Sequence, residues 1–532
     1  MPLKSKHHRH LHRAHENQDN AFKKPKPLPK RSLNGALILG VLGLVLAAGI
    51  FFSAGENMYF WVLLILAIIL TANAILLRFN FSTPFLLPFV ITMVKTKHTI
   101  NFIYSIAHHS KWFEKICLVG MFLGFGITGV DYWYGRKLGG WKRVALLSLS
   151  TVILGVIFEF GIKFLFSVPL FAPLYIPCLV GFLFLGFGGM TFALMLGYGL
   201  LSLNGAFFGQ QYCPSVAPVI PGAPIPGLGT VIPLIAWVSL ALVLIIHEFS
   251  HGILMAYYKE KIKSVGLLLA GIFPIGAFVE QDDKTFNKLD DKKSLMVLSA
   301  GSASNLFSIA IAVILMVAIG FASQPLATSF NAEYNKAYNG VKVLSVEDTV
   351  SFCGTTVPAP AKGKFLAGDI INSINGVDVN SLSGINRAIL SSSGDLNFSI
   401  LRLSDKNVLV PASVSLTPYL FKDLNLKKVG VVFAALPTGY EMDGGIVASE
   451  TIVQMILQIL LFWAILSFAA GSFNYLPSDP FDGGRMGKII LAPYFAFMGL
   501  NKKETQVLIG RIFMWLLVIA LVLNMVPYLT MI

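Results

Sequence analysis

Long apolar stretches constrain this chain more than any other feature of its sequence. Hydrophobic residues make up 55% of the 532 residues and charged residues only 13%, whereas soluble proteins carry about 25% charged residues. A helix needs about 20 apolar residues to cross a bilayer. Stretches of that length predict helical spans near residues 34–53, 57–78, 115–131, 144–166, 175–200, 232–257, 295–321, 449–470 and 506–531. The expected fold class is a polytopic α-helical membrane protein with about nine or ten spans.

Three further apolar segments are too short or too broken to span. Phe81–Val94 contains two prolines and is expected to be a re-entrant or interfacial piece, and Gly484–Gly499 a partial span. Gly266–Val279 is interrupted by glycines and a proline. Irregular apolar backbone at membrane depth needs protein or a watery cavity beside it. This segment is therefore expected to be either a re-entrant β-hairpin or an additional loop of the core. The Gly/Pro-rich residues 205–233 are expected to form a loop or hairpin.

The first 33 residues form a basic tail, which carries much of the formal net charge of +14. They are too polar for a cleavable signal peptide. The positive-inside rule favours a disordered segment on the cytoplasmic side. A metal-binding tail is the alternative, because five histidines lie there: His7, His8, His10, His12 and His15. No folded basic module accompanies the tail, so nucleic-acid binding is not expected.

The four cysteines exclude a cysteine zinc site, because none forms a CxxC pair. Cys117 and Cys178 lie in apolar helices and are expected to be packing residues. Cys213 and Cys353 lie in predicted loops, and the sequence leaves open whether they form a disulfide.

The motif His247-Glu248-Phe249-Ser250-His251 lies inside an apolar run. The HExxH spacing puts two imidazoles one helical turn apart on one face, with a carboxylate beside them. That arrangement is typical of a zinc site with its own general base. Ionisable side chains within a membrane helix are costly and indicate function. The alternative is a trio of polar side chains that is hydrogen-bonded inside a helical bundle.

A catalytic zinc takes three protein ligands and keeps one open position. No histidine follows His251, so the third ligand is expected to be a carboxylate. Asp482 is the first candidate, because it follows two prolines and precedes two glycines, which break the helix and admit close backbone approach. Asp479 is the rival, although its place between a serine and a proline better suits a turn.

Residues 323–445 form the one large polar block, with strand-like pieces at 341–346, 369–375 and 396–402 and a short helix at 383–391. Within it, Gly368-Asp369-Ile-Ile-Asn-Ser-Ile-Asn375-Gly376 resembles the "GD-x-I-x-x-I-N-G" segment of PDZ domains of the bacterial protease-associated type. That resemblance implies a strand, a tight Asn-Gly turn and a return strand, and hence an inserted soluble α+β PDZ-like domain with a peptide or substrate contact.

The two zinc-ligand segments together resemble those of the site-2 protease family of intramembrane zinc metalloproteases. That family pairs HExxH with "N-x-x-P-x-x-x-x-DGG" on a later helix, which matches Asn474, Pro477, Asp482, Gly483 and Gly484. A Gly/Asn pair between the motifs matches Gly301 and Asn305. The resemblance covers residues 205–532.

The resemblance implies one Zn²⁺ per chain, held by His247, His251 and Asp482, with Glu248 as general base. Asn305, Asn474 and Gly276 are candidates for contacts with substrate backbone or a developing oxyanion. The implied substrates are membrane proteins with transmembrane segments, cut within or near those segments in regulated intramembrane proteolysis. The alternatives are a zinc-binding transporter or channel, and an inactive scaffold of the same family.

The expected organisation is a basic tail (1–33), accessory spans (34–204), a first catalytic part (205–322), a PDZ-like domain (323–447) and a second catalytic part (448–532). Counting spans from a cytoplasmic tail places the PDZ-like domain on the extracytoplasmic face. One basic loop opposes this count, because Arg136, Lys137, Lys142 and Arg143 would lie outside.

Overall fold

The computed structural model describes residues 37–38, 40–46, 48, 58–78, 83–84, 91–96, 98–107, 110–169, 171–208, 220–222, 231–270, 273–286, 288–352, 355–379, 381–404, 408–421 and 425–527. The whole basic tail (1–33), half of the predicted span at 34–53, and both Cys213 and Cys353 lie outside these residues.

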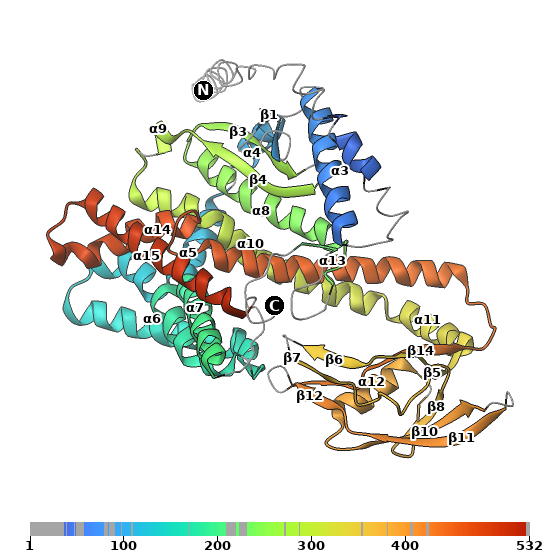
Figure 1. Cartoon of the computed structure of the whole chain (residues 1–532). Helices are drawn as coiled ribbons and strands as arrows, with labels where there is room; N and C mark the ends of the chain where they lie inside the picture. Colours follow the sequence, from blue (N-terminus) through green and yellow to red (C-terminus); the bar gives the residue numbers. More distant parts are fainter. Residues whose placement is uncertain are drawn as a thin grey trace. The chain divides into compact units, whose positions relative to one another are not determined.

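Seven helices of the described residues are long and apolar enough to cross a membrane (Figure 1). They are α5 (Lys111–Trp133), α6 (Gly140–Gly161), α7 (Tyr175–Phe207), α8 (Ala236–Tyr257), α10 (Asp291–Ala322), α13 (Gly444–Asn474) and α15 (Lys502–Asn524). Each overlaps a predicted span, and α3 (Met58–Arg78) coincides with another. The chain is therefore a multi-pass helical membrane protein.

Several boundaries differ from the sequence prediction. The α7 helix continues to Phe207, into the segment predicted as a loop or hairpin. Two helical pieces replace the partial span predicted at 484–499: α14 (Asp482–Leu491) and the 3₁₀ helix η4 (Ala492–Met498). Further short helices are α4 (His98–Ala107), α9 (Asp283–Phe286), η1 (Gly135–Lys137), η2 (Lys163–Ser167) and η3 (Ala172–Leu174).

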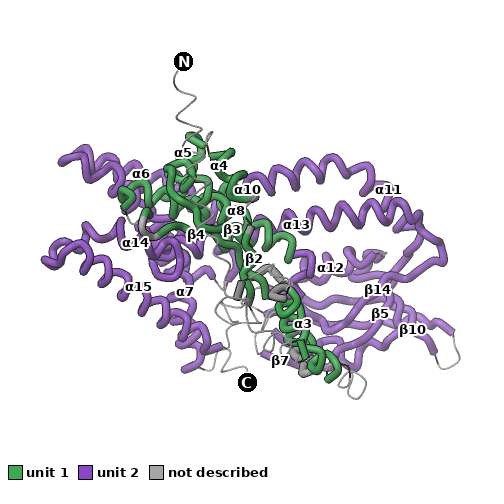
Figure 2. The backbone as a smooth tube through the Cα atoms, turned by 90° about the horizontal axis from the view of Figure 1, so that it is seen from above, with its two compact units in different colours: residues 1–121, 237–308, 466–471 green, residues 122–236, 309–465, 472–532 purple. Residues whose placement is uncertain are grey.

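The chain forms two compact units, which Figure 2 distinguishes by colour. Unit 1 comprises residues 1–121, 237–308 and 466–471, and unit 2 comprises residues 122–236, 309–465 and 472–532. Unit 1 contains α8 and the first half of α10. Unit 2 contains most of the accessory helices, α14, α15 and the inserted domain.

Unit 1 contains an antiparallel sheet in the order β1-β2-β3-β4. Its strands are β1 (Thr83–Pro84), β2 (Ile91–Thr96), β3 (Ile262–Ala270) and β4 (Phe273–Gln281). The β3–β4 pair confirms the hairpin reading of Gly266–Val279. The end of the segment Phe81–Val94, predicted to be re-entrant or interfacial, belongs to the same sheet, because β2 pairs along β3. Gly266 allows β2 to lie this close to β3, because a Cβ at this position would lie 2.0 Å from the carbonyl oxygen of Val94.

The inserted domain, residues 338–437, follows α11 (Gln324–Ala337) and precedes α13. Its main sheet has the order β11-β10-β8-β5-β14, with β9 paired to β8, and α12 lies against this sheet (Figure 1). The strands are β5 (Tyr338–Val346), β8 (Ile370–Ile374), β9 (Val377–Asp378), β10 (Leu396–Leu403), β11 (Leu409–Leu416) and β14 (Val431–Pro437), and the helix is α12 (Leu382–Ser391). Two smaller pairs join β6 (Thr349–Phe352) to β7 (Thr355–Pro358) and β12 (Tyr419–Phe421) to β13 (Leu426–Lys428).

The three predicted strands and the predicted helix of this domain are confirmed. The Asn-Gly turn is confirmed as well, because Asn375 and Gly376 have φ angles of 53° and 81° and join β8 to β9. Positive φ at both central residues is the requirement of a type I′ hairpin turn. Alternate residues of the strands pack with Ile385 and Ile389 of α12 into one apolar core.

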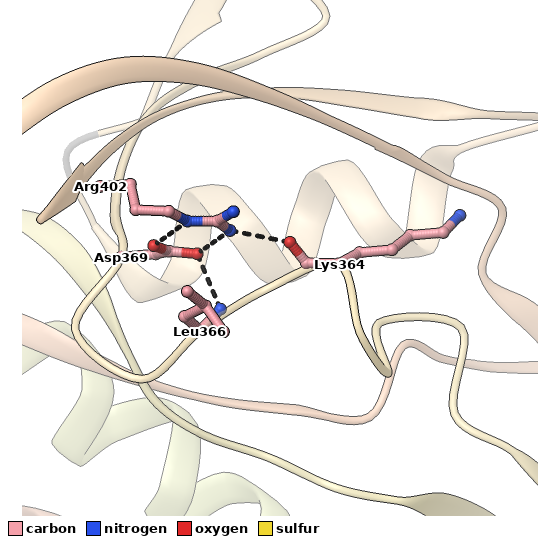
Figure 3. A network of polar contacts seen from close by, with 4 residues as sticks. All are labelled: Lys364, Leu366, Asp369 and Arg402. Carbon is pink, nitrogen blue, oxygen red and sulfur yellow. Dashed lines mark hydrogen bonds and ion pairs between the residues drawn. The ribbon is translucent and has the colours of Figure 1, made fainter. Parts of the chain in front are cut away.

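An ion pair between the buried carboxylate of Asp369 and the partly exposed Arg402 holds the loop before β8 (Figure 3). The Asp369 side chain is 1% exposed and accepts hydrogen bonds from Arg402 at 2.8 and 2.6 Å. It also accepts a hydrogen bond from the backbone N–H of Leu366, while Arg402 donates to the carbonyl of Lys364. The hydrogen bonds with Asp369 raise the pKa of the Arg402 guanidinium. The loop therefore depends on one carboxylate that is satisfied at both oxygens.

Replacing Asp369 by Ala should destabilise the inserted domain by about 3 kcal/mol, because it leaves a half-buried guanidinium and a backbone N–H without their acceptor. Urea-dependent pulse proteolysis of the full-length protein would measure the change. Asp348→Ala is the matched control, since its pair with Lys362 is exposed on both sides and contributes at most about 1 kcal/mol. Equal effects of the two substitutions would contradict the assignment.

Candidate metal centre

The α8 helix presents both histidines of the HExxH motif on one buried face in unit 1. His247 is 7% exposed and His251 is 9% exposed. Their ring centroids lie 4.9 Å apart, with the rings inclined at 74°. The four-residue spacing on a helix brings the rings together, so the local sequence alone decides this part of the geometry.

The His251 ring is oriented by a backbone carbonyl. Its Nδ1 atom donates to the carbonyl oxygen of Val297 in α10, at 2.7 Å. A carbonyl can only accept, so the proton sits on Nδ1 and the lone pair on Nε2. Metal-binding histidines usually have such an acceptor behind the ring, which fixes the tautomer.

The His247 ring has an amide partner on α10, the helix that also carries Val297. The side-chain Nδ2 atom of Asn305 lies 3.1 Å from Nδ1 of His247. Asn305 is fully buried, and its other amide atom, Oδ1, has no hydrogen-bond partner. Exchanging the amide nitrogen and oxygen of Asn305 places Oδ1 against Nδ1 of His247. The hydrogen-bond network decides between these two orientations. With Oδ1 against Nδ1, the amide accepts from Nδ1–H and leaves the lone pair of His247 on Nε2.

Gly301 lies where the two imidazoles meet α10. A Cβ at this position would lie 2.5 Å from Nε2 of His251 and 2.6 Å from Nε2 of His247. No side-chain carbon tolerates such distances, so the space beside the two nitrogens requires glycine. The Gly301/Asn305 pair singled out in the sequence thus has two distinct tasks: one residue admits the rings, and the other orients one of them.

The Glu248 carboxylate contacts the edge of the sheet in unit 1. Its Oε2 atom accepts a hydrogen bond from the backbone N–H of Val279 at 3.0 Å. Val279 belongs to β4, the last strand in the order of the described sheet. Gly276 lies in the same strand, three residues earlier, and pairs with Leu268 of β3. The structure thus places the glutamate of the motif beside a strand whose outer edge is open in the described sheet.

Unit 2 carries the acidic candidates. Asp482 is the first residue of α14, eight residues after Asn474 ends α13. Cβ atoms at Gly483 and Gly484 would lie within 2.6 Å of the backbone of Tyr475 and Ser478. The two glycines therefore let the first turn of α14 fold back on the preceding loop, as the sequence predicts. The rival Asp479 forms an ion pair with Lys488.

The described residues offer a candidate donor set for a metal ion: a ring nitrogen from each of His247 and His251 and a carboxylate oxygen from Asp482. Two imidazoles and a carboxylate are a ligand set of catalytic zinc. The residues around the histidines fit a bound cation. Both Nδ1 atoms have partners in α10, and both Nε2 atoms face Gly301, where no side chain fills the space.

Two features of this centre carry no sequence signal. The Val297 carbonyl and the Val279 N–H are backbone groups, and any residue type could supply them. The period of α10 would have placed Val297, Gly301 and Asn305 on one face, but not opposite the histidines. The remaining candidates Gly368, Asp369, Asn375 and Gly376 lie in the inserted domain, where they form the loop and turn around β8.

Comparison with known proteins gives a family match and one relative. A model of peptidase family M50 matches residues 235–520, the range that contains α8, α10 and α14. The chain is also 28% identical over 257 residues to an uncharacterized protein of Methanocaldococcus jannaschii. The alignment covers 48% of this chain and 57% of that protein, so the match spans little more than half of the relative's length.

Replacing Gly301 by Ala should lower the affinity for zinc at least about 10-fold, the scale of effect seen when residues that orient metal ligands are changed. The added methyl group would displace both ring nitrogens, although alanine favours the helix itself. Competition against a chelator measures the affinity. Gly320→Ala is the control, since a Cβ there meets nothing within 4 Å on the same helix. Wild-type affinity in both variants would refute the assigned role of Gly301.

Proposed function

Because this chain belongs to peptidase family M50, we propose that it is a zinc endopeptidase that cuts membrane proteins within or near their transmembrane segments. The M50 peptidases are the site-2 protease family of intramembrane zinc metalloproteases. The observation that carries the proposal is the imidazole pair of α8. Both rings have partners at Nδ1, and Glu248 stands beside them at a strand edge. If His247, Glu248 and His251 had only a structural role, the space left by the missing side chain at Gly301 would not be needed.

Zinc would be held by Nε2 of His247, Nε2 of His251 and the carboxylate of Asp482. Bound there, zinc supplies Lewis acidity, which lowers the pKa of a coordinated water toward about 7. The ion pair of Asp479 with Lys488 supports Asp482 over its rival, because a carboxylate already neutralised by a lysine is a weaker ligand. The start of α14 also suits an anionic side chain, since helix N-termini favour negative charge.

Glu248 takes the proton of the attacking water and later delivers it to the leaving amine. The contact with the Val279 N–H leaves one carboxylate oxygen, Oε1, for this work. A general base must lie within hydrogen-bond reach of the proton that it removes. The position of Glu248, one residue after His247 and three before His251, supports that reach.

The substrate would bind as an added strand along β4. A helix cannot be cut until it unwinds, because its carbonyl groups are engaged in the helix itself. The outer edge of a strand offers backbone groups that hold an extended peptide. Glu248 bonds to an N–H of this same edge, so a peptide paired along β4 through Gly276 would run toward the base. With the Asn305 amide turned so that Oδ1 accepts from His247, its Nδ2 group is available to donate to a substrate carbonyl.

The inserted domain would act as a PDZ-like module that screens substrates already shortened by another protease. Its strand–turn–strand at β8–β9 and the packing of α12 against the sheet support the resemblance. We further propose that it lies on the extracytoplasmic face, with the basic tail in the cytoplasm. The charge count from the tail through the spans supports this placement.

The proposed chemistry is tested on purified full-length protein with model transmembrane peptides. Glu248→Gln should keep the fold and its zinc, because the amide oxygen can still accept from Val279 N–H, but cleavage should fall about 10²–10⁴-fold. Asp482→Asn should lose zinc as well as cleavage, since a neutral amide is a poorer ligand. Cleavage at the wild-type rate by Glu248→Gln would favour a transporter or a scaffold.

The proposed topology is tested by labelling Ser383→Cys, an exposed position of α12, in a protein without its four native cysteines. An impermeant thiol reagent should modify this residue in intact cells. Labelling only after lysis would place the inserted domain in the cytoplasm and overturn the screening role outside the cell.

A further inference from the structure

We infer that the accessory helices α5, α6 and α7 are positioning elements of the metal centre, because they hold the segment that carries Asp482. These helices lie before residue 235, outside the range matched by the family model. The inference rests on the proposed function, in which Asp482 is a zinc ligand. All of the contacts that carry it lie within unit 2.

Tyr475 is the first point of attachment. It follows the end of α13 and is fully buried. A Cβ at Gly124 of α5 would lie 2.3 Å from the Tyr475 ring, and a Cβ at Gly188 of α7 would lie 2.2 Å from the Tyr475 carbonyl oxygen. The Phe125 ring also meets the Tyr475 ring edge to face, at 6.3 Å. Two accessory helices thus close on this one residue, on its ring and on its backbone.

The two helices are shaped for this contact. The sequence Phe-Leu-Gly-Phe-Gly occurs at 122–126 in α5 and again at 184–188 in α7. Gly126 and Gly186 have φ angles of 55° and 54° and interrupt their helices. Each touches the backbone of the other helix, since their Cβ atoms would lie 2.4 and 2.0 Å from carbonyl oxygens. Only glycine satisfies both the backbone angle and the space.

The contact reaches Asp482 through the backbone. A Cβ at Gly483 would lie 2.3 Å from the carbonyl carbon of Tyr475, so the first turn of α14 rests on the peptide that the accessory helices hold. Leu476 is fully buried in a cluster with Met195 of α7, and Phe481 packs against the same cluster. A shift of Tyr475 therefore moves the residue beside Asp482.

Tyr494 is the second point of attachment, beyond the end of α14. Its hydroxyl donates to Asp131 of α5 at 2.5 Å. The Asp131 side chain is 3% exposed and also accepts two hydrogen bonds from Arg143 of α6, at 2.8 and 2.6 Å. A buried carboxylate of this kind is costly unless it is fully paired. The accessory helices thus hold α14 by its C-terminal side as well.

The test compares Gly124→Ala with Gly155→Ala in the full-length protein. Both positions are helical glycines of the accessory region, but a Cβ at Gly155 meets nothing within 4 Å. Gly124→Ala should release zinc to a chelator at least about 10-fold more readily and should alter the visible absorption spectrum of the cobalt-substituted protein. Gly155→Ala should match the wild type in both measurements.

A milder variant guards against misfolding of Gly124→Ala. Tyr494→Phe keeps the ring and removes only the hydroxyl bonded to Asp131, and it should weaken zinc binding in the same direction. Wild-type zinc affinity and cobalt spectrum in Tyr494→Phe and in any folded Gly124→Ala protein would overturn the inference. Zinc retained by Asp482→Asn would instead overturn the ligand assignment of the proposed function. Zinc lost by Asp482→Asn but kept by the other two variants would refute the positioning role alone.

Discussion

Two imidazole rings buried among apolar helices need a partner at both ring nitrogens, and this need organises the centre of unit 1. Without partners, each ring would lose its hydrogen bonds to water and gain nothing in return. The α10 helix supplies both partners at Nδ1, a backbone carbonyl for His251 and an amide for His247. It also supplies the glycine that leaves room at Nε2. One face of α10 therefore decides which nitrogen of each ring is available to a metal ion.

The sheet of unit 1 contributes two further features beside the histidine pair: an open strand edge, and a backbone group that orients Glu248. The Val279 N–H holds one oxygen of Glu248, and the same strand leaves its outer side open in the described sheet. One hydrogen bond thus joins the proposed base on α8 to the proposed peptide-binding edge of β4. This arrangement suits a peptidase that acts on extended chains, because the strand that aligns the substrate also orients the base. It is less easily explained for a transporter, which needs no base beside its ligands.

Glycines determine how closely the backbones approach in both units. In unit 1, Gly266 admits β2 to the hairpin. In unit 2, Gly483 and Gly484 fold α14 back on the preceding loop, while Gly124 and Gly188 admit Tyr475. Small residues at helix contacts are favoured in membranes because association there depends on close packing rather than on the hydrophobic effect. In this chain such contacts support the segments that carry the candidate ligands, so they link the accessory helices to the proposed chemistry.

The sequence alone determined the helical membrane class, most spans, the histidine pair and the strand–turn–strand of the inserted domain. These features depend on local length, periodicity or turn chemistry: twenty apolar residues make a span, a four-residue spacing brings His247 and His251 together, and Asn375-Gly376 forms its turn with nearest neighbours alone. Tertiary structure decided the rest. It decided pairings across long stretches of chain. Strand β2 joins β3, and the Val297 carbonyl and Asn305 contact the two imidazole rings. In the same way, Gly124 contacts Tyr475, and Asp131 accepts from Tyr494. Several of these pairings are made by backbone groups, which every residue type carries, so composition and spacing cannot predict them.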